Sequence, residues 1–137
     1  MTENRFSFDG KRAMVVGGAS GIGAATADVL RQLGAEVVVL DIQPVSGGVA
    51  SIALDLTDKA SIERAVDECT GPIHALASCA GVADGTPGLP TINLIGQRHL
   101  IELVVARELM ILSTPTSYRI PTSRGVMKLD PIQTFCW

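Results

Sequence analysis

A glycine-rich segment at residues 17–23, Gly-Gly-Ala-Ser-Gly-Ile-Gly, constrains the fold of this chain more than any other feature. It follows a short apolar run, Ala-Met-Val-Val at residues 13–16, which is too brief for a helix and predicts a buried strand. After it, apolar residues recur at helical spacing as far as Gly34, a natural stop. A strand, a glycine-rich turn and a helix in this order favour a phosphate-binding site, because the backbone approaches the ligand closely and the helix N-terminus offers free amides. The alternative is a purely structural turn.

Strands and helices continue to alternate as far as about residue 110. Apolar runs at residues 36–41, 51–54 and 73–79 predict three further strands. Helices are expected after a cap at Thr57 or Asp58, and again over residues 91–112. Only 4% of the residues are aromatic, so the core must consist of Ala, Val, Leu and Ile, as in buried parallel strands. The order predicts an α/β fold: a doubly wound parallel sheet that binds its ligand at the carboxyl ends of the strands.

Two acids stand where predicted strands end. Asp41 lies 18 residues after Gly23, the last glycine of the turn. A dinucleotide-binding unit carries an acid about 20 residues on, which bonds the ribose hydroxyls. A carboxylate there also repels the extra phosphate of NADP, which predicts NAD as the cofactor. Asp55 follows the third strand and could accept a hydrogen bond from the adenine amine. The alternatives are an ordinary turn acid for Asp41 and a helix-capping or surface acid for Asp55.

Composition and charge argue against several other classes of protein. A net charge of −3 gives no basic surplus for nucleic acid, and no apolar run approaches the ~20 residues that span a bilayer. The N-terminal residues show no apolar signal region, which predicts a cytoplasmic protein. The three cysteines (Cys69, Cys79 and Cys136) have no metal-binding spacing, so we expect reduced thiols and no metal. His74 and His99 lack a matching acid and nucleophile, and structural roles are expected for both.

Five segments together resemble the short-chain dehydrogenase/reductase family. Residues 15–23 are similar to its TGxxxGIG segment, with Val16 in place of threonine. Residues 78–81 (Ser-Cys-Ala-Gly) are similar to its NNAG segment with both asparagines replaced, and residues 93–96 to its N-x-x-G segment. The acids at 41 and 55, each followed by an aliphatic residue, also fit. The resemblance covers roughly residues 8–110, and the short loop after Asp41 resembles the bacterial 3-alpha-hydroxysteroid and coniferyl alcohol dehydrogenase branch.

The resemblance implies a Rossmann-type fold and hydride transfer between NAD and a secondary alcohol or ketone of the steroid or aromatic alcohol class. The turn would bind the pyrophosphate, the two acids and their neighbours the adenosine, and residues 79–81 the nicotinamide ribose. The cofactor-binding residues it implies are Gly17, Ser20, Gly21, Ile22, Gly23, Asp41, Ile42, Asp55, Leu56, Cys79, Ala80 and Gly81. Asn93 would be a catalytic position that supports a proton-relay water.

The family's Tyr-x-x-x-Lys pair is missing. The sole tyrosine is Tyr118, with Thr122 four residues later and Lys128 ten residues later. Residues 111–137 contain three prolines and seven serines or threonines and show no clear period. We therefore expect a dinucleotide-binding half-domain at residues 1–110, truncated after the fourth strand and its helix, and an atypical tail at 111–137. The alternatives to an enzyme are an inactive nucleotide-binding or interaction module, whose open sheet edge invites self-association, and a truncated or frame-shifted fragment.

Overall fold

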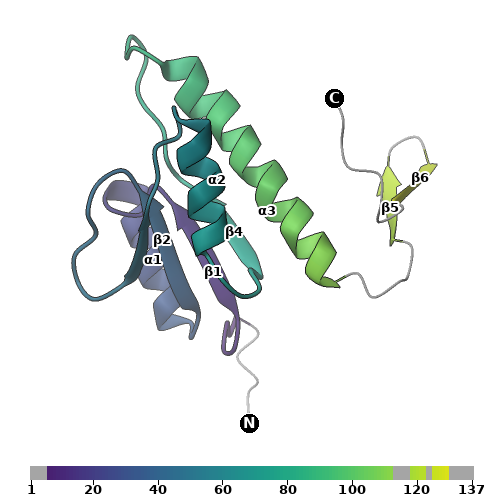
Figure 1. Ribbon diagram of the computed structural model, residues 1–137. Helices are drawn as coiled ribbons and strands as arrows, with labels where there is room; N and C mark the ends of the chain where they lie inside the picture. Colours follow the sequence, from purple (N-terminus) through teal and green to yellow (C-terminus); the bar gives the residue numbers. More distant parts are fainter. Residues whose placement is uncertain (1–5, 113–117, 123–124, 130–137) are drawn as a thin grey trace.

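A computed structural model describes residues 6–112, 118–122 and 125–129 of the chain (Figure 1). Its centre is a four-stranded parallel sheet in the order β3-β2-β1-β4. The strands are β1 (Arg12–Val16), β2 (Glu36–Asp41), β3 (Ala50–Ala53) and β4 (Ala75–Ser78). The chain builds the sheet outward from β1 to β3 and then crosses to the other side of β1. The strand order reverses between β1 and β4, where doubly wound sheets bind their ligands.

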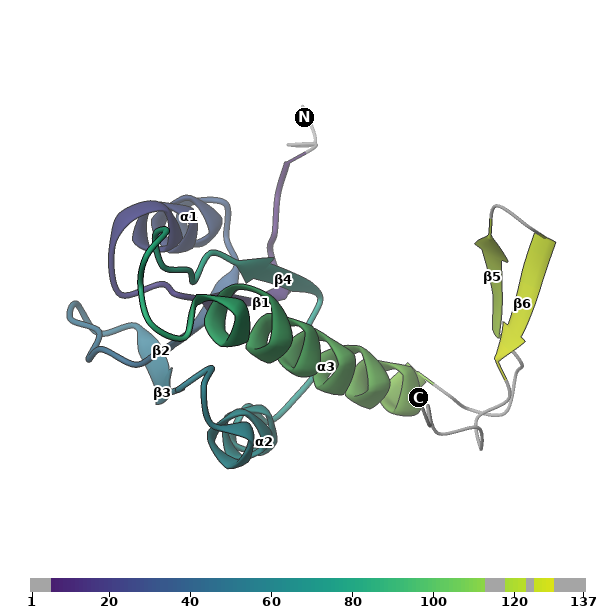
Figure 2. The same cartoon turned by 90° about the horizontal axis from the view of Figure 1, so that it is seen from above.

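The two central strands are buried on both faces, as their continuous apolar sequences predict. Alternate residues of β1 and β2 point into two separate core clusters, because successive side chains of a strand face opposite ways. One cluster contains Met14 and Leu40 and is covered by α2 (Lys59–Glu68) and α3 (Gln97–Leu112). The other contains Val15 and Val39 and is covered by α1 (Gly21–Gln32). Figure 2 shows the resulting three layers, with α1 on one side of the sheet and α2 and α3 on the other.

The predicted elements are present, with small differences at their ends. Asp58, one of the two expected caps, begins α2, and its Oδ1 accepts a hydrogen bond from the Ala60 N–H at 3.0 Å. Gly34 follows α1 with φ +94°, a conformation that glycine adopts without strain. The helix expected over residues 91–112 begins with a six-residue π-helix, η1 (Thr91–Gly96), before it continues as α3. The wider first turn was not predicted, and π-helical turns often occur at functional sites.

Two further strands lie in the segment for which the sequence shows no regular period. β5 (Tyr118–Thr122) pairs antiparallel with β6 (Gly125–Leu129) as a separate two-stranded sheet. Tyr118 stands opposite Leu129, and Arg119 stands opposite Lys128. The tail therefore contains regular structure that the sequence pattern did not predict. Among the described residues, the helices are too short or too polar to span a bilayer.

Candidate functional site

The glycine-rich turn joins β1 to α1 and requires glycine at two positions for different reasons. Gly17 has φ +78°, and a Cβ there would come within 2.5 Å of the Ala80 backbone. Gly23 lies in the first turn of α1, where an added Cβ would collide with the carbonyl group of Gly17. Ser20 occupies the N-cap position, and in the described structure its side chain makes no capping hydrogen bond to the helix. The first turn of α1 therefore keeps amide donors that can bind an anion.

Asp41 lies at the carboxyl end of β2, directly beside this turn. Its Oδ2 accepts a hydrogen bond from the Ala19 N–H at 2.9 Å, and its Oδ1 accepts one from the Gln43 N–H at 2.8 Å. These two bonds fix the orientation of the half-buried carboxylate. Each carboxylate oxygen has a further lone pair, so the group can still accept hydrogen bonds from hydroxyl groups of a ligand.

Two exposed isoleucines flank the carboxylate and the turn. The side chain of Ile22 is 80% exposed at the start of α1, and that of Ile42 is 63% exposed after β2. Both residues are in the set of predicted cofactor contacts. Aliphatic side chains left uncovered beside polar groups are typical of a ligand site, where they provide apolar contact while the polar groups set orientation.

The predicted adenine contacts at the end of β3 have different surroundings. The Asp55 Oδ1 accepts hydrogen bonds from the Thr57 N–H at 2.8 Å and the Thr57 hydroxyl at 2.7 Å. Both bonds favour the ionised form, so the pKa of Asp55 lies below its ordinary value of 3.8, chiefly because of the hydroxyl. Leu56 is only 8% exposed and belongs to the core. Gly96 of η1 packs against its backbone. The structure thus places the Leu56 side chain inside the protein.

The Thr57 hydroxyl provides a test of this turn. Because the folded-state pKa of Asp55 is depressed, its stabilising effect exists above the unfolded pKa and disappears as the pH falls through the folded pKa. We expect Thr57→Val to raise the Asp55 pKa toward its ordinary value and to move acid unfolding to higher pH. Thr57→Ser keeps the hydroxyl and should behave like the wild type. An NMR titration of the Asp55 carboxyl in the three proteins measures this directly, and an unchanged pKa in Thr57→Val would contradict it.

The end of β4 and the chain that follows it are held by two amide side chains from the next helix. We call residues 78–82, which begin with the last residue of β4, the post-β4 segment. The Asn93 Oδ1 accepts a hydrogen bond from the Val82 N–H, and its Nδ2 donates one to the Val82 carbonyl, both at 2.8 Å. Gln97 donates from Nε2 to the Ala80 carbonyl at 2.5 Å and accepts a bond from the Ser78 hydroxyl. Asn93 was predicted from the sequence but Gln97 was not, because the only sequence signal of Gln97 is its place one turn later on the same helical face.

Apart from the buried Leu56, the predicted site residues lie at the carboxyl ends of the strands. The Cys79 N–H donates to the Val16 carbonyl at 2.8 Å, which joins the post-β4 segment to the end of β1. The contacts of Gly17 with Ala80 and of Ala19 with Asp41 connect the turn to both neighbouring strands. The residues after β1, β2 and β4 are therefore in contact with one another, and Asp55 lies two residues beyond the end of β3.

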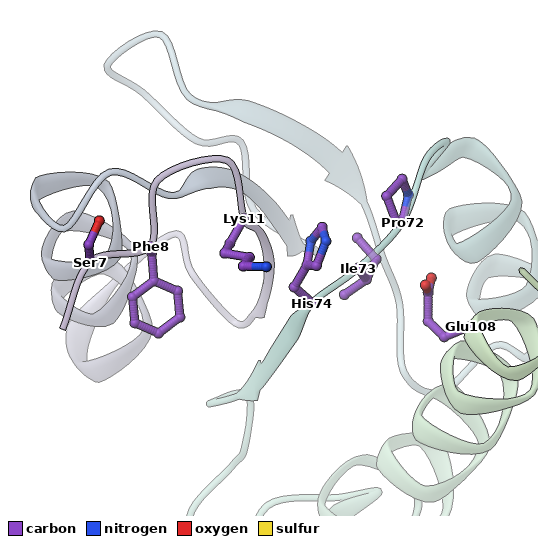
Figure 3. A pocket seen from close by; sticks show the side chains of 7 residues that line it. All are labelled: Ser7, Phe8, Lys11, Pro72, Ile73, His74 and Glu108. Carbon is purple, nitrogen blue, oxygen red and sulfur yellow. The ribbon is translucent and has the colours of Figure 1, made fainter. Parts of the chain in front are cut away.

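A hollow of about 540 Å³ lies at the other end of the strands, where they begin (Figure 3). It is lined by Ser7, Phe8, Lys11, Pro72, Ile73, His74 and Glu108. Lys11 and His74 immediately precede β1 and β4, so this hollow is at the amino ends of the strands, away from the glycine-rich turn. The His74 Nδ1 accepts a hydrogen bond from the Arg12 N–H at 3.0 Å, a structural contact. In the part of the chain that the structure describes, no three His, Cys, Asp or Glu side chains lie together in a group that could hold a metal ion.

Comparison with known proteins gives a consistent family. The family model described as short chain dehydrogenase matches residues 11–93. The NAD-dependent glycerol dehydrogenase of Listeria innocua is 31% identical, over 96% of this chain and 60% of its own length. The coniferyl-alcohol dehydrogenase of a Pseudomonas species is 36% identical, over 71% of this chain and 39% of its own.

Solved structures show the same fold. A gluconate 5-dehydrogenase from Burkholderia cenocepacia, in complex with NADP and tartrate, superposes with a TM-score of 0.66 at 25% identity. The superposition covers 75% of this chain and 50% of that one. Similar curated relatives are matched over 32% to 60% of their own lengths, so the chain spans between about a third and three fifths of each. The family match, the sheet order and the glycine-rich turn agree: the chain belongs to the short-chain dehydrogenase family, whose members are oxidoreductases that bind a nicotinamide dinucleotide.

Proposed function

We propose that this chain is the cofactor-binding half of an NAD-dependent dehydrogenase that oxidises a secondary alcohol or reduces a ketone. One observation carries the proposal: the Asp41 carboxylate is held against the Ala19 amide of the glycine-rich turn, beside the N-terminus of α1. A carboxylate fixed there can accept hydrogen bonds from the two hydroxyls of a ribose whose phosphate binds the helix N-terminus.

The choice of NAD over NADP rests on the charge of Asp41. An additional phosphate on that ribose would lie against a carboxylate that two backbone amides hold in place. Such repulsion readily exceeds the ~1.4 kcal/mol that corresponds to tenfold discrimination. The glycerol dehydrogenase relative is described as NAD-dependent, which supports the proposal, whereas the gluconate 5-dehydrogenase structure contains NADP. The cofactor therefore varies among similar proteins, and this position gives the specific reason for NAD.

The residues around the turn, at the end of β2 and on η1 then have binding or orienting roles. The glycine-rich turn, with Ser20 and Ile22, would hold the pyrophosphate and the nearby ribose, while Asp41 and Ile42 would hold the adenosine. Asn93 would keep the post-β4 segment in place beneath the nicotinamide ribose through its paired bonds to Val82. Bound NAD supplies the acceptor for the hydride. The substrate class we propose, steroid or aromatic alcohols, is supported by the coniferyl-alcohol dehydrogenase relative.

The organisation of the chain belongs to the same proposal. We assign residues 1–110 to the dinucleotide-binding half-domain and residues 111–137 to a separate tail that includes β5 and β6. Ile101 and Val105 of α3 are exposed, which supports self-association of the chain. Cys69 and Cys79 are both free thiols, which supports a reducing, cytoplasmic environment.

A second candidate function is dinucleotide binding without catalysis. It is favoured by the surroundings of the only tyrosine: Tyr118 begins β5, and the position four residues later, where the family pair has lysine, is Thr122 at the end of that strand. A tyrosine acts as a general acid or base only when its pKa, ordinarily about 10, is lowered by a neighbour such as that lysine. Turnover of an aromatic alcohol with NAD that is lost in Tyr118→Phe would favour the enzyme, and cofactor binding without turnover would favour the module.

Replacement of Asp41 by asparagine tests the cofactor assignment. We expect wild-type protein to bind NADH at least about tenfold more tightly than NADPH. In Asp41→Asn this preference should fall to about twofold or less, mainly because NADPH binds more tightly once the negative charge is gone. Fluorescence titrations with both reduced cofactors measure the four affinities.

Asparagine is the matched substitution because its side-chain carbonyl can still accept the bond from the Ala19 N–H. Asp28→Asn, on the exposed surface of α1, serves as the control for a lost negative charge and should leave the preference unchanged. A wild-type preference for NADPH, or a preference that Asp41→Asn retains, would contradict the assignment of NAD.

A further inference from the structure

Gln97, the first residue of α3, makes contacts that the family resemblance does not account for. Its side-chain amide donates to the Ala80 carbonyl at 2.5 Å and accepts from the Ser78 hydroxyl, so it holds two points of the post-β4 segment at once. We propose that Gln97 is a positioning residue that fixes this segment and thereby sets the affinity of the site for the nicotinamide half of the cofactor. The inference deepens the proposed function and rests on it.

The post-β4 segment has few means of holding its own conformation. Residues 79–81 are Cys, Ala and Gly, none of which has a strong hydrogen-bonding side chain. Ser78 is the exception, and its hydroxyl is turned toward α3, where it bonds to Gln97. A primary amide has both a donor and an acceptor, so a single Gln97 side chain satisfies the Ser78 hydroxyl and the Ala80 carbonyl together.

Gln97 and Asn93 act on successive parts of the same segment. They are four residues apart, hence on the same face of the continuous η1–α3 helix, and both direct side-chain amides at backbone groups of the segment. Asn93 holds Val82 at the far end, and Gln97 holds the portion next to β4. Without Gln97, among the hydrogen bonds of the described residues, the part of the segment between β4 and Val82 would keep only the bond from the Cys79 N–H to the Val16 carbonyl.

The contacts of Ala80 extend this effect to the phosphate-binding turn. The Ala80 backbone lies so close to Gly17 that a single added carbon on Gly17 would come within 2.5 Å of it. Gln97 therefore holds Ala80 from the α3 side while Gly17 bounds it from the turn side. A shift of Ala80 would therefore change its contact with the turn. In the proposed binding mode, the part of the dinucleotide between the pyrophosphate and the nicotinamide would lie at this contact. The adenosine end, at Asp41, has no contact with Gln97 among these bonds.

The test compares a complete cofactor with its adenosine part in the full chain. Gln97→Leu removes both hydrogen bonds, while Gln97→Glu keeps an acceptor for Ser78 and places a carboxylate against the Ala80 carbonyl. Gln32→Leu, at the exposed end of α1, is the matched control. We expect both Gln97 variants to weaken NADH binding about tenfold, equivalent to about 1.4 kcal/mol, and ADP-ribose binding less than about twofold. The control should change neither affinity.

The ratio of the two affinities separates positioning from general damage. Equal weakening of NADH and ADP-ribose, or weakening of neither, would overturn the inference, because a merely structural role affects both ligands alike. Hydrogen exchange at the Cys79 and Val82 amides gives a readout that needs no ligand, and exchange should be faster in Gln97→Leu than in the wild type. Unchanged exchange would show that Gln97 does not hold the post-β4 segment in place. If exchange is faster in Gln97→Leu than in the wild type but the wild type binds no NADH, the proposed function is overturned instead.

Discussion

Gly23→Ala is expected to destabilise the fold by up to about 2 kcal/mol and to weaken dinucleotide binding by at least about tenfold. The cause is steric, since a Cβ on Gly23 would collide with the Gly17 carbonyl on the other side of the turn. Urea unfolding and NADH titration of Gly23→Ala measure the two effects.

Two effects of opposite sign act on the free energy of unfolding of Gly23→Ala, namely the helix propensity of alanine and the steric collision. Gly23 lies inside α1 with no positive φ, where alanine normally stabilises a helix by about 1 kcal/mol relative to glycine. The collision involves backbone atoms, which cannot move aside by a change of rotamer. Relief requires a shift of the whole turn. Overpacking of this kind costs about 1–3 kcal/mol, which equals or exceeds the stabilisation that alanine gives a helix. The turn that moves is the one that would hold the pyrophosphate, so binding should suffer more than stability.

Gly21 provides the control within the same turn. It has φ +55°, and apart from its chain neighbours and the backbone of its own helix, no described heavy atom lies within 4 Å of the place a Cβ would take. Gly21→Ala should therefore cost only the strain of the left-handed conformation, about 1–2 kcal/mol, with the Gly17 carbonyl left in place. Because Gly21 is itself a predicted cofactor contact, the comparison uses a readout without ligand: if the backbone NMR signals of Gly17 moved no more in Gly23→Ala than in Gly21→Ala, the collision with Gly17 would not be the cause.

Much of the fold follows from the sequence because the decisive signals are local. The apolar runs that form β1 and β2 admit only a strand buried on both faces, and the glycines between elements mark where each one ends. The parallel sheet then follows from the alternation of strands and helices. The position of Asp41 beside the turn was predictable for the same reason, since parallel neighbours end at the same edge of the sheet.

The missed features depend on contacts between elements that are distant in sequence. Leu56 follows Asp55 at a strand end, which suggested a ligand contact, but the packing of η1 over it places its side chain in the core. Gln97 acts on residues 17 to 19 positions earlier, and no local pattern reveals such a bond. The strand β5 contains a proline, and the segment around β5 and β6 shows no regular alternation, so their pairing was not predictable from periodicity either.

Arg107 is another such residue, and its loss is expected to have the largest effect on stability. From α3 its guanidinium donates to the carbonyls of Val66 at 2.7 Å, Cys69 at 2.5 Å and Gly71 at 3.3 Å, all at or beyond the end of α2. The last carbonyls of a helix lack partners within the helix and carry partial negative charge, so a cation there satisfies them and opposes the helix dipole. Arg107 thus joins α2 to α3.

We expect Arg107→Met to lower the free energy of unfolding by about 2–4 kcal/mol. Hydrogen bonds from a charged donor contribute about 1.5–3 kcal/mol each, but the side chain is 22% exposed and water would replace part of the loss. The variant also leaves Glu108, 16% exposed, without the guanidinium that lies 3.0 Å from its carboxylate. Equilibrium unfolding in urea measures the difference in free energy.

Arg98→Met is the matched control on the same helix. Arg98 forms an exposed ion pair with Glu102 at 2.7 Å, four residues away, and such pairs contribute about 0.3–0.5 kcal/mol. The double variant Arg107→Met, Glu108→Gln should recover part of the stability, because it removes the carboxylate that the single variant leaves unpaired. If Arg107→Met lowers the free energy of unfolding no more than Arg98→Met does, the guanidinium does not join the two helices. A large loss that Glu108→Gln partly restores would instead show that the Arg107 cap on α2 stabilises the packing of α2 against α3.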